Sequence, residues 1–129
     1  MTLPALAFSQ NKKDNAIIIH ENIPTEKIND ILFSNGYIVS KSDSNFITTE
    51  AKEIKGVSIK FAISRKDSIM ILKGWQKPLM SIQIYGVKSE YDFDVIYFAG
   101  MKGSILRNSW NEFDRMAKEI SDKIEYTKQ

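Results

Sequence analysis

Few side chains in this sequence have the type and spacing that catalysis or metal binding requires. His20 is the only histidine, and the chain has no cysteine. Disulfides, thiolate zinc sites and cysteine nucleophiles are therefore excluded. A histidine base needs an orienting partner, and a metal needs several ligands. We expect His20 to be a surface or hydrogen-bonded residue at the end of a strand.

Three carboxylates, Glu90, Asp92 and Asp94, alternate within the aromatic segment at residues 85–98. On a strand all three would point to one side, where they could act as paired acids or hold calcium weakly. The segment lacks the asparagine, glycine and distal glutamate of an EF-hand loop. We therefore expect a solvated acidic loop.

The segment from Gly100 to Gly103 has the GxxG form with which KH domains clamp an RNA backbone. In KH domains the motif joins two helices, whereas here it follows an expected strand. Its backbone amides could instead hold an anion near a helix start. The net charge is only +2, and three of the 18 basic residues are arginine. This balance argues against a nucleic-acid partner.

No P-loop, GxSxG or Rossmann fingerprint is present in the chain. The sequence thus assigns no catalytic residue, no metal ligand and no cofactor. Large aromatic side chains are better candidates, because they combine apolar area with a polar handle. Trp75, Tyr85 and Tyr97 are candidates for contact with a partner or ligand, whereas Trp110 is expected in the core.

Residues 57–75 show the clearest strand pattern and predict a β-hairpin. Apolar and polar residues alternate up to Ile63, as in a half-buried strand. Residues 65–68 are polar, and a second apolar run begins at Ile69. A two- or four-residue loop there predicts the pairs Ile63 with Met70, Phe61 with Leu72 and Ile59 with Gly74.

This register places Ile69, Ile71 and Trp75 on the face of the sheet away from the main core. A three-residue loop would turn Ile69 and Ile71 inward, but it would bring Lys73 in with them. We therefore expect an apolar stripe on the second face, which another segment must cover or a partner must bind.

The other elements can be placed around this hairpin. A strand at residues 16–20 precedes a helix that Thr25 can cap and that Gly36 ends. Strands at residues 37–41 and 46–51 come before the hairpin, and strands at 80–84 and 94–98 follow it. A last helix carries an apolar stripe from Trp110 to Ile124.

The start of this last helix has two interpretations. Ser109 and Glu112 form a capping box, while Ser104 could cap a helix that begins earlier. Two amphipathic helices each need to bury one stripe. We expect an α+β fold in which an antiparallel sheet of about five to six strands carries both helices on one face, in the order β-α-β-β-β-β-(β)-α.

Length and composition indicate one domain, which we place at residues 14–129. The chain has 129 residues, of which 43% are hydrophobic, as in ordinary globular domains. No segment has the roughly 18 to 20 apolar residues of a membrane span. Residues 1–13 read as a signal-peptide remnant or a flexible N-terminus, because Ala5-Leu6-Ala7 has the small-x-small form of a cleavage site.

Short motifs add a resemblance to a known group. They are FITTE at residues 46–50, Lys73-Gly74-Trp75, and the closing segment at residues 102–120. With the layout above, the chain resembles small exported bacterial domains of unknown function that have a helix-on-curved-sheet fold like that of the TATA-binding protein. It is also similar to the repeat domains of the outer-membrane assembly lipoprotein BamC. The resemblance covers about residues 14–126 and implies an exported, periplasmic or envelope location and an accessory or binding role.

Two functions follow as hypotheses. The first is a non-enzymatic envelope module whose second sheet face docks an envelope protein, a peptide or another copy of the chain. The alternative is a small-molecule or glycan-processing domain that uses the acidic aromatic segment at residues 85–98.

Overall fold

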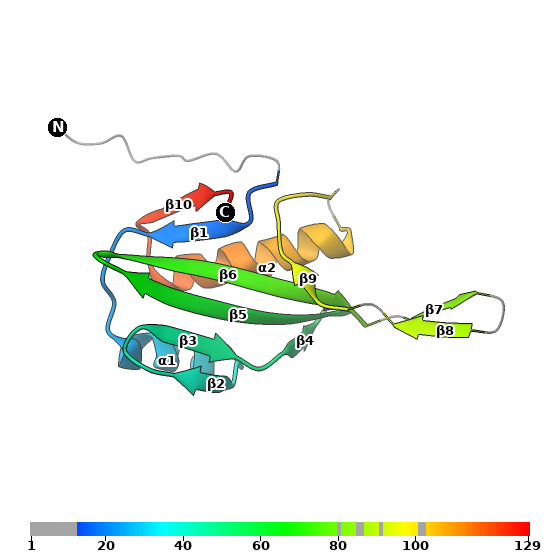
Figure 1. Cartoon of the computed structure of the whole chain (residues 1–129), viewed down its shortest axis with the longest axis horizontal. Coiled ribbons are helices and arrows are strands. Elements are labelled where there is room, and N and C mark those ends of the chain that lie inside the picture. The colour runs from blue at the N-terminus through cyan, green and yellow to red at the C-terminus, as the bar shows by residue number, and fades with distance from the viewer. Residues whose placement is uncertain (1–12, 80, 85–86, 91, 101–102) are drawn as a thin grey trace.

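The computed structural model describes residues 13–79, 81–84, 87–90, 92–100 and 103–129. Within them, ten strands and two helices form an α+β structure (Figure 1). The elements in order are β1 (Ala16–Ile19), α1 (Thr25–Ser34), β2 (Val39–Ser42), β3 (Phe46–Thr49), β4 (Lys52–Ile54), β5 (Val57–Lys66), β6 (Ile69–Pro78), β7 (Ser81–Ile84), β8 (Val87–Glu90), β9 (Asp94–Val95), α2 (Ile105–Ile120) and β10 (Ile124–Thr127). The expected fold class is confirmed.

The main sheet is larger than the five to six strands expected. Its eight strands run in the order β10-β1-β6-β5-β3-β2, with β4 also beside β5 and β9 also beside β6. Every pair in it is antiparallel. Strands β7 and β8 form a separate two-stranded sheet, which projects from one end of the molecule (Figure 1).

The central hairpin is β5 with β6, as expected, but the predicted register is wrong by two residues. Ile63 pairs with Leu72, and Phe61 pairs with Gly74. The strands continue through Lys66, so that the loop is only Asp67 and Ser68. Asp67 has a φ of +57°, a conformation that aspartate tolerates better than most residues.

A slip of two residues keeps every side chain on its expected face, because side chains alternate with a period of two. The residues expected beneath the helices are all buried: Ile59, Phe61, Ile63, Met70 and Leu72.

Both helices lie on one face of the sheet, behind it in the view of Figure 1, and they contact each other. The Phe61 ring from β5 lies 4.9 Å from the Tyr37 ring and 6.1 Å from the Phe113 ring, measured between centroids. Trp110 is 1% exposed, as expected for a core residue. The core is therefore a layer between the central hairpin and the two helices.

Gly74 lets α2 approach β6 closely. A Cβ atom at this position would lie 2.9 Å from Ile96 Cδ1 and 3.1 Å from Phe113 Cδ1. Any larger residue would have to displace these core side chains.

Helix α2 begins and ends earlier than its apolar stripe predicts. Ser104 is the N-cap, and its hydroxyl accepts a hydrogen bond from the N–H of Arg107. The earlier of the two predicted starts is thus observed, and the capping box at Ser109 is wrong. The helix stops at Ile120, and Ile124 pairs with Ile19 in the sheet.

Helix α1 ends before Gly36, which has a φ of +84°, as expected for the residue after a helix. The expected cap by Thr25 is wrong. Pro24 holds the N-cap position without a side-chain bond, and the Thr25 hydroxyl instead accepts from Arg65. The first turn of α1 is thus tied to the end of β5.

Strands β4, β8 and β10 were not anticipated from the sequence, and the expected strand at residues 94–98 contains only the two residues of β9. The predictions for residues 1–13 fall, except for Lys13, outside the described residues.

Candidate functional site

The strongest candidate for a site is the face of the main sheet opposite the helices. In β6 the helix side carries Met70, Leu72 and Gly74, so the residues between them point outward. Ile69, Ile71 and Trp75 lie on this outer face and are half-buried. No described helix covers it. The structure therefore brings three of the five predicted contact residues onto one surface.

Neighbouring strands extend the apolar surface. Ile18 of β1 pairs with Ile71 and is also half-buried. Ile71 pairs with Ser64 of β5, and Ser64 pairs with Phe46 of β3. Phe46 is 39% exposed. An apolar row broken by one serine thus crosses the sheet from β1 to β3.

A groove of about 350 Å³ lies at the Trp75 end of this face. Four aromatic residues line it, together with one lysine and a group of small or hydroxyl-bearing residues. The full lining is Ser40, Phe46, Thr48, Thr49, Lys60, Phe61, Ala62, Trp75 and Phe93. The groove therefore combines aromatic walls with hydrogen-bonding groups and one cation.

Phe93 reaches the groove because β9 pairs with the second half of β6. Val95 is opposite Trp75, and Phe93 lies two residues before Val95. The Nζ atom of Lys60 is 4.2 Å from the centroid of the Phe93 ring, and that of Lys77 is 5.6 Å away. Both distances fit cation–π contacts. The ring thus forms one wall of the groove and is held by two lysines.

This face is also positively charged. The register of the central hairpin places Lys60, Lys66, Lys73 and Lys77 on it. Across the described residues, no ion pair joins any of the four to a carboxylate. The acids that strand pairing puts on this face, Glu53 and Glu125, lie on the flanking strands β4 and β10.

The other two predicted contact residues are Tyr97 and Tyr85. Tyr97 is half-buried in the connection between β9 and α2, and it does not line the groove. Tyr85 lies outside the described residues. The sequence reasoning missed Phe46, Phe93 and the lysines. The lysines could have been found from the same alternation that identified Ile71, but Phe93 could not, because its position depends on the pairing of β9.

The lone histidine has one clear partner. His20 Nε2 lies 2.6 Å from Glu125 Oε1, and both side chains are partly exposed at the β1–β10 side of the sheet. His20 is therefore hydrogen-bonded, as expected.

The three alternating acids do not share one strand. Glu90 ends β8, whereas Asp94 begins β9. Asp92 and Asp94 are exposed, and Asp94 Oδ1 accepts a bond from the N–H of Val95. Within the described residues, no group of three or more potential ligands could hold a metal ion. The Gly100 carbonyl of the GxxG segment accepts a bond from Arg107.

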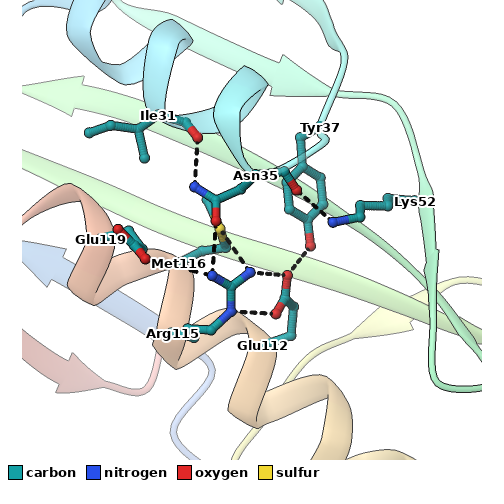
Figure 2. A network of polar contacts seen from close by, with 8 residues as sticks. All are labelled: Ile31, Asn35, Tyr37, Lys52, Glu112, Arg115, Met116 and Glu119. Carbon is teal, nitrogen blue, oxygen red and sulfur yellow. Dashed lines mark hydrogen bonds and ion pairs between the residues drawn. The ribbon is translucent and has the colours of Figure 1, made fainter.

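A second polar cluster, shown in Figure 2, lies between the helices. The Tyr37 hydroxyl donates to Glu112 Oε2 over 2.6 Å, and Arg115 binds both oxygens of Glu112 at 2.8 and 2.9 Å. Arg115 also donates to Asn35 Oδ1, and Asn35 donates to the Ile31 carbonyl. The chain of bonds thus joins the C-terminal end of α1 to the middle of α2.

Two side chains of this cluster are buried, and burial changes the pKa of Tyr37. Tyr37 is 1% exposed and Glu112 is 9% exposed. Burial raises the pKa of the Tyr37 hydroxyl above its ordinary value, and the neighbouring Glu112 carboxylate raises it further. The hydrogen bonds that Arg115 donates to Glu112 raise the pKa of Arg115. The partners of the Glu112 carboxylate are side chains of the protein itself, so the cluster ties α2 to the end of α1.

No family model, characterised protein or solved structure matches the chain. Among the described helices, none has the length and apolar character needed to cross a membrane. Of the expected resemblance, only the general architecture is observed: an α+β fold in which two helices pack on an antiparallel sheet.

Proposed function

We propose that this protein is a non-enzymatic binding module of the cell envelope that docks a protein or ligand partner on its helix-free sheet face. The observation that carries the proposal is the position of Ile18, Ile71 and Trp75, half-buried on a face that no described helix covers. Exposed apolar surface of this kind marks interaction sites. The partner is an envelope protein or peptide, or a second copy of the chain.

The envelope location rests on the sequence. Ala5-Leu6-Ala7 fits a signal-peptidase site, and the motifs at residues 46–50 and 102–120 resemble those of exported domains with a TATA-binding-protein-like or BamC-like fold. Both features agree with an accessory role at the envelope.

The non-enzymatic role is supported by how the polar groups are used. The buried carboxylate of Glu112 is bonded to Tyr37 and Arg115. Asp92 and Asp94 are exposed to solvent and do not line the groove. These arrangements favour binding over the alternative of a glycan-processing site.

Cross-linking in the native envelope, followed by identification of the partner, tests this function. Trp75→Ala and Ile71→Ser each remove apolar area from the outer face and should abolish the cross-link. Phe33→Ala is the matched control, because Phe33 lies on α1 and is 79% exposed. It should leave the cross-link intact. Thermal unfolding of each variant verifies that the domain is folded, and capture of the same partner by both folded outer-face variants would refute the proposal.

A further inference from the structure

The groove crosses the strands rather than following one of them. Its lining includes Ser40 from β2, Thr48 from β3, Ala62 from β5 and Trp75 from β6. Neighbouring strands are about 4.8 Å apart, so four strands span roughly 14 Å. An extended chain rises about 3.3 Å per residue, and about four residues cover this length. The groove therefore has the length for a short extended segment.

The aromatic walls of the groove leave room for an apolar side chain. Phe46, Trp75 and Phe93 border the groove, whose volume is about 350 Å³. Pockets that enclose a whole small ligand start at about 300 Å³ and reach about 1,000 Å³. A space of this size admits a large apolar side chain of a longer partner, which its aromatic walls would contact.

Lysines surround this anchoring position. Lys60 is opposite Trp75 and lines the groove, while Lys73 and Lys77 lie two residues before and after Trp75 on the same face of β6. Two residues along a strand correspond to about 7 Å. Within the described part of the chain these ammonium groups have no carboxylate partner. They are single point charges, which suit separate carboxylates better than the paired oxygens that arginine binds.

We propose that the partner is an acidic, extended segment of polypeptide with one large apolar residue. The apolar side chain enters the groove between Phe46, Trp75 and Phe93, and flanking carboxylates meet Lys60, Lys73 and Lys77. This inference rests on the proposed function and names the chemistry of its partner. Opposite charges of this kind steer association and set its dependence on salt.

Peptide titrations of the full chain, followed by NMR, test the inference. The probe is a blocked peptide Asp-Glu-Phe-Asp-Glu, with Asn-Gln-Phe-Asn-Gln as the charge control and Asp-Glu-Ser-Asp-Glu as the anchor control. We expect the probe to shift the Trp75 indole and β5–β6 amide signals. It should bind about tenfold more tightly than either control, since each lost contact removes part of the binding free energy.

Substitution of lysines tests which positive charges contact the peptide. Lys60→Gln combined with Lys73→Gln should weaken binding of the probe peptide about tenfold. The same change should make the affinity less dependent on salt concentration. The matched control is Lys27→Gln combined with Lys128→Gln, which removes the same charge from lysines outside the groove and should leave binding unchanged. Equal binding of the uncharged peptide, or no effect of the Lys60 and Lys73 changes, overturns the inference.

The same titrations distinguish an acidic peptide from other occupants of the groove. Tighter binding of oligogalacturonate than of any peptide would identify an acidic glycan. Self-association that is lost in Trp75→Ala would identify a second copy. Either result overturns the inference. If the envelope cross-link is lost in Trp75→Ala but kept when Lys60 and Lys73 are glutamine, the proposed function stands and the acidic partner does not.

Discussion

At the scale of single residues, the buried pair of Tyr37 and Glu112 ties the segment after α1 to α2. A buried carboxylate is costly unless hydrogen bonds replace its lost water. Tyr37 and Arg115 supply three such bonds to Glu112. The Tyr37 hydroxyl keeps its proton because burial and the adjacent carboxylate raise its pKa. The bond therefore persists wherever the hydroxyl is protonated.

Tyr37→Phe should lower the free energy of unfolding by about 2 kcal/mol at pH 7, since hydrogen bonds to charged groups are worth about 1.5 to 3 kcal/mol. The raised pKa makes this contribution dependent on pH. It is fully present below the pKa of an unfolded tyrosine, about 10. Above that pH the unfolded state loses its proton first, and the contribution falls by about 1.4 kcal/mol per pH unit.

Urea unfolding of both proteins between pH 7 and pH 11 measures this difference. The gap between wild type and Tyr37→Phe should be constant up to pH 9 and should narrow above pH 10. A gap that stayed the same up to pH 11 would show that Tyr37 does not keep its proton in the folded protein.

At the scale of elements, the alternation of β5 and β6 allowed the core and the outer face to be predicted although the register was wrong. Which face a side chain occupies depends on its position along the strand, not on which residue is opposite. The outer position of Ile71 and Trp75 was predictable for the same reason.

Short strands were not predictable in this way. In β10, Ile124 lies four residues after Ile120, so its spacing fits a continuing helix. Only the pairing of β10 with β1 places it in the sheet. Phe93 likewise reaches the groove because β9 pairs with β6, and no local pattern encodes that pairing. The groove thus depends on long-range contacts that the sequence does not reveal.

The start of α2 gives a second prediction. Ser104→Ala removes the hydroxyl that caps the helix and should lower the free energy of unfolding by about 1 kcal/mol. Ser109→Ala is the matched control. The Ser109 hydroxyl is buried, and within the described residues it has no hydrogen-bond partner. Its removal should be neutral or slightly stabilising.

Chemical denaturation of the two serine variants decides between the two helix starts. If Ser109→Ala were the more damaging change, the capping box at Ser109 would be the real start, and the first turn from Ile105 would contribute little.

At the scale of the whole molecule, the sheet separates two kinds of surface. One face is covered by α1 and α2 (Figure 1). The other carries apolar side chains and lysines of the central hairpin, and among the described residues these lysines form no ion pair. Strand β10 covers the edge of β1 and completes the core beside α2. The Tyr126 ring lies 5.8 Å from the Trp110 ring, and its hydroxyl bonds Asp114.

Truncation after Ser121 tests this role of β10. It exposes the backbone of Ala16–Ile19 and removes Tyr126 from Trp110, so the free energy of unfolding should fall by about 3 kcal/mol. The bare edge should also promote self-association. Replacing residues 80–91 with a short Gly-Ser linker is the control, since β7 and β8 pair only with each other among the described strands, and it should cost less than about 1 kcal/mol. Urea unfolding and sedimentation measure both effects. If the truncated protein stayed monomeric and as stable as the control, the pairing of β10 with β1 would contribute little to stability. The sheet would then depend mainly on the central hairpin.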